Sequence, residues 1–256
     1  MRMLGYAYLG TMFAFIFLPV VVLVLFSFQS SRLPVPPFDG PSLKWYVQVL
    51  TDRDLMAALR NSLMVAALSS LVALALGFLA AQGLARVHLP GSVFLRGLLI
   101  APMTVSYLIV ALGLLSLFNQ LGLRPSLWAT GIGHVVINLP LCFAIVFAAM
   151  GDHQKNAERA ARDLGANEVQ VLGLITAPML MPALLAAYFL SVTFSWDEFI
   201  IAFLLTRFDV TLPVEIWSML RSGLSPATNA IGSLVFLVSV AILMVLEVTI
   251  FRKSRA

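Results

Sequence analysis

Six long stretches of apolar residues divide this 256-residue sequence and constrain its fold more than any other feature. They cover residues 8–28, 62–85, 97–118, 127–150, 182–206 and 230–251. A helix needs about 20 apolar residues to cross the hydrocarbon core of a bilayer, and lipid cannot satisfy free backbone groups. With 61% hydrophobic and 11% charged residues, the sequence predicts an all-α, polytopic membrane protein with six transmembrane helices.

The distribution of basic residues predicts the orientation of these helices. The short segment 86–96 carries Arg86, His88 and Arg96 without an acid, and residues 252–256 form a basic tail. Basic residues gather in cytoplasmic loops, so we expect both termini in the cytoplasm. The first stretch is longer than the apolar region of a signal peptide and no A-x-A site follows it, so we expect it to be a retained span.

The net charge of +4 does not indicate a nucleic-acid partner, because no Lys/Arg-rich run is interleaved with aromatic residues. The chain is expected to comprise a first transmembrane helix and an outer loop (1–61), a transmembrane domain (62–251) and the basic tail (252–256). Within the transmembrane domain, residues 151–181 form a long polar segment between two apolar stretches.

The polar segment has the pattern of two helical pieces separated by a turn. Residues 157–164 favour a helix, and Gly165 fits a C-terminal stop because glycine readily adopts the left-handed conformation. A second piece is predicted from about Asn167 to Pro178. The segment might lie on the inner membrane surface, but the apolar face formed by Ala160, Ala161 and Leu164 is small. We therefore interpret it as an element that docks on a partner protein.

The spacing within this segment resembles the EAA loop of ABC importer permeases. That motif has Glu-Ala-Ala, three residues, Gly, nine residues and Ile-x-Leu-Pro. Here the corresponding residues are Arg159, Ala160, Ala161, Gly165, Ile175, Thr176, Ala177 and Pro178. The motif's Glu is replaced by Arg159, although Glu158 precedes it, and the motif's Leu is replaced by Ala177. In the family this loop is a coupling helix that fits a cleft of the ATP-hydrolysing subunit.

The resemblance implies a coupling role for residues of this segment: Glu158, Arg159, Ala160, Ala161, Asp163, Leu164 and Gly165. It also implies the type I, MetI-like permease fold and a location in the bacterial inner membrane. The implied partners are an ATPase dimer, a second homologous permease, a periplasmic solute-binding protein and membrane lipid. ATP and Mg²⁺ would be bound by the ATPase, and this chain itself would hold no cofactor or metal.

Other motifs resemble the polyamine (spermidine/putrescine) branch of these permeases. They are Gly133-His134, Leu139-Pro140, the run 195–199 (Ser-Trp-Asp-Glu-Phe), Thr211-Leu212-Pro213, the run 216–219 and the run 225–230. The substrate implied is a polyamine or another small amine. At the start of the third stretch the branch often has Pro followed by an acid, whereas this sequence has Ser106-Tyr107. A monocationic or zwitterionic amine, an amino acid or a sugar-like solute therefore stays open.

Asp197 and Glu198 are the candidate residues for a cationic solute, because a carboxylate within a span should face the bundle interior or a wet cavity. The alternative is that one acid caps a helix end or pairs with Arg207 or Arg221. The family resemblance favours Asp197 as the more substrate-specific acid. Further candidates for the solute pathway are Ser195, Trp196, Asn138 and Tyr107, whose ring could hold an ammonium group. Asn138 and His134 could instead serve helix packing near Pro140.

The sequence contains no P-loop motif G-x-x-x-x-G-K-[ST], so ATP hydrolysis would need a separate subunit. It also has no Ser/His/Asp, Cys/His or H-E-x-x-H set typical of catalysis, and three scattered histidines predict no metal site. We therefore expect a non-enzymatic transport subunit. A self-contained secondary transporter or channel is the alternative.

Overall fold

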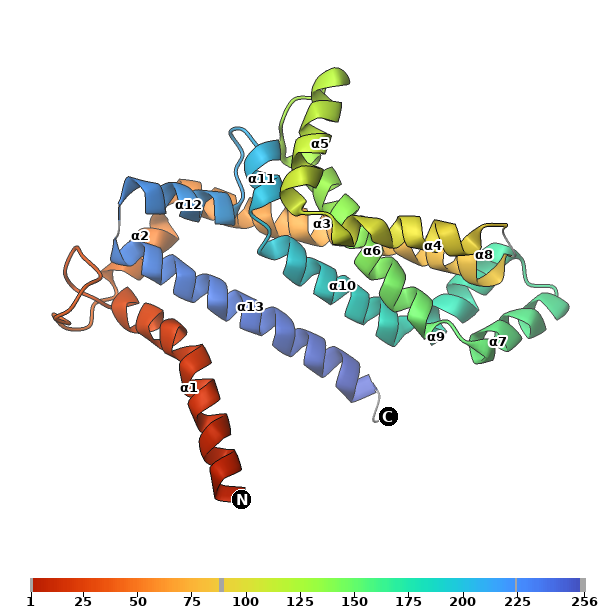
Figure 1. Cartoon of the computed structure of the whole chain (residues 1–256), viewed down its shortest axis with the longest axis horizontal. Helices are drawn as coiled ribbons and strands as arrows, with labels where there is room; N and C mark the ends of the chain where they lie inside the picture. Colours follow the sequence, from red (N-terminus) through yellow and green to blue (C-terminus); the bar gives the residue numbers. More distant parts are fainter. Residues whose placement is uncertain (1, 88–89, 224, 254–256) are drawn as a thin grey trace. The chain divides into compact units, whose positions relative to one another are not determined.

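The computed structural model describes residues 2–87, 90–223 and 225–253, and within them the chain is almost entirely helical (Figure 1). Its elements are α1 (Arg2–Ser27), α2 (Lys44–Thr51), α3 (Arg53–Arg86), α4 (Ser92–Ile100), η1 (Ala101–Thr104), α5 (Tyr107–Gln120), α6 (Leu127–Ala149), α7 (Asp152–Asp163), α8 (Glu168–Gln170), η2 (Val171–Thr176), α9 (Ala177–Met179), α10 (Met181–Trp196), α11 (Ile200–Leu205), α12 (Leu212–Ser222) and α13 (Pro226–Lys253). The predicted all-α class is confirmed. Of the predicted tail 252–256, residues 254–256 lie outside the described residues, as does His88.

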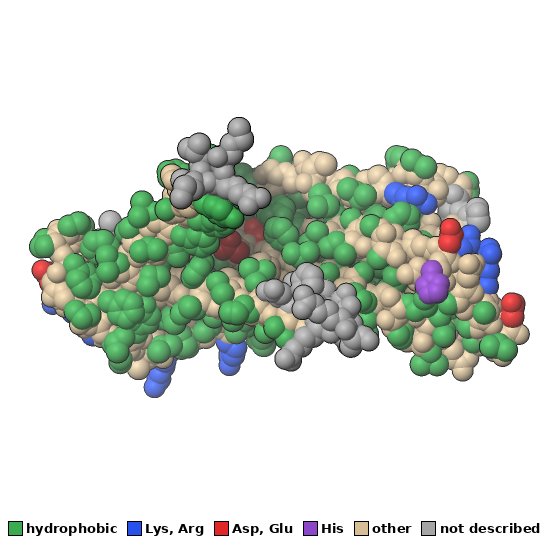
Figure 2. All heavy atoms as spheres, turned by 90° about the horizontal axis from the view of Figure 1, so that it is seen from below, with side chains coloured by type: hydrophobic (Ala, Val, Ile, Leu, Met, Phe, Trp, Pro, Cys, Tyr) green, Lys and Arg blue, Asp and Glu red, His purple; other side chains and the backbone are tan. Residues whose placement is uncertain are grey.

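Four helices are long and apolar enough to cross a membrane without interruption. They lie within α1, α3, α6 and α13, where continuous spans were predicted. Two bent helix pairs raise the number of candidate spans to as many as six. Figure 2 shows one face of the molecule, on which hydrophobic side chains predominate. A surface on which apolar side chains are exposed in this way suits contact with lipid rather than with water.

The two remaining predicted spans are interrupted rather than continuous helices, a feature that the prediction of six transmembrane helices did not include. The stretch 97–118 is broken between η1 and α5, and the helices on either side differ in direction by 103°. The stretch 182–206 ends its first helix at Trp196 and resumes as α11 at Ile200. Apolar composition identifies segments that belong in lipid, but it does not report where a side chain or proline interrupts the backbone hydrogen bonds.

The described chain divides into two compact units. The first comprises Met1–Leu59 and Leu212–Ala241, and the second comprises Arg60–Thr211 and Ile242–Ala256. In the first unit, the buried Gln29 organises the loop after α1. Its amide nitrogen donates to the Pro37 carbonyl at 2.9 Å, its side-chain oxygen accepts from the Asp39 N–H at 3.1 Å, and its own carbonyl accepts from Trp45 Nε1 at 2.7 Å.

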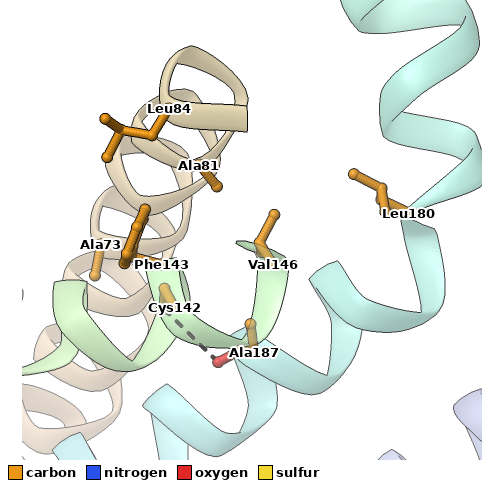
Figure 3. Close-up of a cluster of buried hydrophobic side chains, with 8 residues drawn as sticks. All are labelled: Ala73, Ala81, Leu84, Cys142, Phe143, Val146, Leu180 and Ala187. Atoms are coloured by element: carbon orange, nitrogen blue, oxygen red, sulfur yellow. Dashed lines mark hydrogen bonds between the residues drawn. The ribbon is translucent and has the colours of Figure 1, made fainter. Parts of the chain in front are cut away.

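The core of the second unit lies where α3, α6 and α10 meet (Figure 3). Its members are small or branched side chains that are almost completely buried: Ala73, Ala81, Leu84, Cys142, Phe143, Val146, Leu180 and Ala187. Small residues let helix backbones approach closely in a membrane, where van der Waals packing drives association. The backbones of α3 and α6 approach closely at Gly77, where an added Cβ would lie 2.8 Å from the Phe143 nitrogen.

This close approach makes a prediction about two glycines of the same helix. We expect Gly77→Ala to lower the free energy of unfolding by about 1–3 kcal/mol, because the new methyl group overpacks the contact with α6. Gly83→Ala is the matched control, since nothing lies within 4 Å of the added Cβ there. Thermal unfolding of both variants in detergent measures the difference. Equal stability of the two would contradict the packing of α3 on α6.

Candidate functional site

The polar segment 151–181 begins with α7, which ends in a glycine turn as predicted. Gly165 has φ of +90°, in the left-handed region that favours glycine. The Gly165 N–H donates to the Arg162 carbonyl at 2.9 Å, and the Ala166 N–H donates to the Ala161 carbonyl at 3.0 Å. These two bonds form a Schellman motif, which satisfies the last carbonyls of the helix. The predicted stop at Gly165 is therefore confirmed.

The second helical piece starts where the sequence predicts, and an ion pair joins its first turn to α7. Asn167 caps it, accepting from the Gln170 N–H at 2.9 Å, and the Gln170 side chain accepts from the Asn167 N–H at 2.9 Å. Across the turn, Arg162 and Glu168 form an ion pair at 2.7 Å. The hydrogen bond from Arg162 lowers the pKa of the Glu168 carboxyl. The geometry of the turn is thus determined locally.

The turn presents an exposed apolar surface at the end of a polar helix. Leu164 is 90% exposed, Val169 80% and Leu174 71%. Among the predicted coupling residues, Arg159, Ala160, Asp163 and Gly165 are also exposed, and Ala161 is half-buried. We call Arg159, Ala160, Asp163, Leu164, Val169 and Leu174 the turn surface. Exposed apolar side chains grouped in this way are typical of an interaction site.

Glu158 differs from the other predicted coupling residues because its side chain has no exposed surface. Arg86, the last residue of α3, reaches both of its carboxylate oxygens: Nε donates to Oε2 at 2.8 Å and Nη2 to Oε1 at 3.2 Å. The Thr176 hydroxyl donates to Oε1 at 3.0 Å. Sequence reasoning did not connect Arg86 or Thr176 with this acid. The only available signal was a lone basic residue at the end of an apolar stretch.

The second candidate site lies at the break after α10, where the two adjacent acids have different environments. Glu198 is 6% exposed and caps the N-terminus of α11. Its carboxylate accepts from the N–H groups of Ile200 at 2.8 Å, Ile201 at 2.9 Å and Ala202 at 3.2 Å. A helix N-terminus favours negative charge. The capping alternative considered for these acids therefore describes Glu198.

Asp197 is exposed, and the described residues provide it with no hydrogen bond or ion pair. It follows the last residue of α10 directly, at a point where the backbone is not helical. Arg207, one of the two cations considered as its partner, instead lies over the Phe208 ring at 5.3 Å. Of the two acids, Asp197 is the exposed one.

A chain of buried polar side chains connects this break to α3 and α6. Ser195 bonds to His134 Nδ1 and lies 3.3 Å from the Ser69 hydroxyl. His134 Nε2 lies 3.5 Å from Glu198 Oε2. On the same face of α10, the Ser191 hydroxyl donates to the Ser70 hydroxyl at 2.9 Å. Sequence reasoning assigned His134 to helix packing, and the structure gives it this role through a hydrogen bond between helices.

The remaining pathway candidates fall into two groups. Asn138 and Trp196 are buried, and neither Asn138 Nδ2 nor Trp196 Nε1 has a hydrogen-bond partner among the described residues. Tyr107 is 37% exposed and is the first residue of α5, directly after the 103° bend. A cavity of about 410 Å³ lies elsewhere, between α3 and α6. Its lining is apolar apart from Ser69, so it offers no charge to an amine.

The environments of the two acids predict different effects on stability. We expect Glu198→Ala to lower the free energy of unfolding by about 1–3 kcal/mol, because buried N–H groups at the start of α11 lose their acceptor. Asp197→Ala should leave it unchanged, since this side chain is exposed and makes no hydrogen bond or ion pair with the described residues. The fraction of each variant that stays monodisperse after heating in detergent measures the effect. A larger loss in Asp197→Ala would contradict the assignment.

Comparison with known proteins places these features in a family. Residues 73–254 match the family described as "Binding-protein-dependent transport system inner membrane component". The chain is 29% identical over 245 residues to the spermidine/putrescine transport system permease protein PotC of Escherichia coli (strain K12), covering 95% of this chain and 92% of that protein. It is 32% identical over 232 residues to the putrescine transport system permease protein PotI of the same strain, covering 87% of this chain and 82% of PotI.

Solved structures agree with this match at the level of the fold. The chain is similar, with a TM-score of 0.70, to a subunit in the crystal structure of a bacterial alginate ABC transporter in complex with an alginate pentasaccharide-bound periplasmic protein. The similarity covers 96% of this chain and 93% of that one at 17% sequence identity. The alternative of a self-contained transporter is thereby set aside. The chain belongs to the family of inner-membrane components of binding-protein-dependent transport systems, and it is a non-enzymatic permease subunit of an ABC importer.

Proposed function

We propose that this permease forms half of a heterodimeric translocation pathway for a small amine, with polyamines as the first candidates. Its other half would be a second, homologous permease. An ATPase dimer that binds ATP and Mg²⁺ would dock on the segment 151–181, and a periplasmic solute-binding protein would deliver the solute. In this arrangement both termini lie in the cytoplasm, on the side of the ATPase.

The turn surface is the observation that carries the coupling part of this proposal. It combines exposed apolar side chains with a turn whose geometry is determined by Gly165, the Asn167 cap and the Arg162–Glu168 pair. A preformed surface loses less conformational entropy on binding than a flexible loop does. Leu164 is the most exposed apolar side chain of the turn surface and suits a pocket on the ATPase. Arg159, which is also exposed, would contact an acidic group there.

We expect Leu164→Asp to abolish copurification of the ATPase with the permease, because the substitution places a charge in an apolar contact. Leu121→Asp is the matched control, since Leu121 is 63% exposed but follows α5, outside the segment 151–181. Gly165→Ala should weaken copurification as well, because a left-handed residue with a side chain costs about 1–2 kcal/mol. Normal copurification of both Leu164→Asp and Gly165→Ala would overturn the docking assignment.

The solute part of the proposal is supported by Asp197 and by the names of the relatives. A solute that carries ammonium groups would find in Asp197 an exposed carboxylate with no other partner among the described residues. PotC and PotI are named for the transport of spermidine and putrescine. Tyr107 adds an exposed aromatic ring, which attracts a cation through its face. Glu198 would add negative potential without direct contact.

We expect Asp197→Asn to reduce uptake of labelled putrescine about 10-fold or more, since hydrogen bonds to charged groups contribute about 1.5–3 kcal/mol. The measurement is ATP-dependent uptake by vesicles that hold the complete transporter with its binding protein. Asp209→Asn is the matched control, because Asp209 is another exposed acid of the same unit. Equal uptake by wild type and Asp197→Asn would remove Asp197 from the pathway. Absence of putrescine and spermidine uptake by the wild type would remove polyamines.

A further inference from the structure

Glu158 is the buried charge of α7, whereas the other charged residues of that helix are exposed or half-exposed. Burial of a carboxylate is costly unless it is paired and hydrogen-bonded. Arg86 and Thr176 supply that pairing, with three donated hydrogen bonds between 2.8 and 3.2 Å. Both oxygens of Glu158 are thus occupied, and no part of its side chain is available to a partner protein.

The three residues come from elements that have different positions in the proposed pathway. Glu158 belongs to α7, which leads to the turn surface. Arg86 is the last residue of α3, a 34-residue span. Thr176 ends the π-helix Val171–Thr176, which continues through α9 toward α10. One carboxylate therefore joins the docking element to the end of α3 and to η2, which leads through α9 and a 77° bend to α10.

The geometry of these contacts restricts relative movement. The guanidinium group of Arg86 binds the carboxylate through two parallel hydrogen bonds, an arrangement that determines orientation as well as distance. The π-helix beside it is a rare form that is frequently found at functional sites. A displacement of α7 would therefore move the ends of α3 and η2 with it.

We propose that Glu158 is a positioning residue that transmits movement of the docked ATPase to α3 and α10 through Arg86 and Thr176. This inference rests on the proposed docking of the ATPase at the turn surface. It assigns to Glu158 a role different from contact with the ATPase. The exposed Arg159 contacts the ATPase, and the buried Glu158 transmits the movement of α7 to its neighbours.

Hydrogen exchange of the assembled transporter tests the inference without knowledge of the solute. Exchange of backbone amides is measured with and without a non-hydrolysable ATP analogue and Mg²⁺. In the wild type, the nucleotide should change exchange in α7 and also in residues 171–180. In Glu158→Gln and in Thr176→Val, the change in α7 should persist, while the change in residues 171–180 should fall about threefold or more.

Two further variants separate transmission from a merely structural role. Thr176→Ser keeps the hydroxyl donor and should restore the wild-type response in residues 171–180. Asp152→Asn makes the same carboxylate-to-amide change at an exposed acid of α7 that lies outside the turn surface, and should respond like the wild type. A wild-type response in residues 171–180 of both Glu158→Gln and Thr176→Val would overturn the inference. So would a loss in Thr176→Val that Thr176→Ser does not restore.

The outcome for α7 distinguishes failure of this inference from failure of the proposed function. If the ATPase copurifies with the wild type but the nucleotide changes exchange nowhere in the segment 151–181, the coupling role of that segment is wrong. If α7 responds in the wild type and residues 171–180 do not, only the transmission through Glu158 is wrong.

Discussion

Lipid cannot hydrogen-bond to a protein backbone, and the second unit of this permease is arranged around that constraint. A break in a span exposes N–H and carbonyl groups that water does not reach. At the break after Trp196, the Glu198 carboxylate accepts from three consecutive N–H groups at the start of α11. The interruption is possible because one side chain replaces the missing backbone acceptors. Without this cap, the non-helical residues that contain Asp197 would have no stable place in the span.

The same constraint explains why two adjacent acids have different roles. The Glu198 carboxylate is buried and accepts hydrogen bonds from the start of α11, while Asp197 follows the end of α10 and is exposed. Adjacent residues of a continuous helix would differ only by about 100° in direction. Because the helix ends just before them, they differ in environment as well. His134, Ser195 and Ser69 then connect this break to α6 and α3 through buried hydrogen bonds.

The polar segment 151–181 and the break are connected through α10. This helix begins just after the π-helix and α9 and ends at Trp196, a length of about 24 Å at 1.5 Å per residue. A helix is rigid, so a displacement of one of its ends also moves the other end. The Arg86–Glu158–Thr176 contacts lie before this helix, on the other side of a 77° bend, and Asp197 follows its last residue. The core of small residues around Gly77 and Cys142 holds α3 and α6 beside it.

The sequence by itself determined the helical class, the apolar spans, the glycine turn at residue 165 and the family. These features depend on local composition or on spacing within one segment, such as the Gly165 conformation and the Asn167 cap. The tertiary structure alone decided where spans break, which acid is buried and what Glu158 contacts. Arg86 and Glu158 are 72 residues apart, and Ser69 and Ser195 are 126 apart. Only the folded chain brings such residues together, because helix packing rather than periodicity sets which side chains face each other.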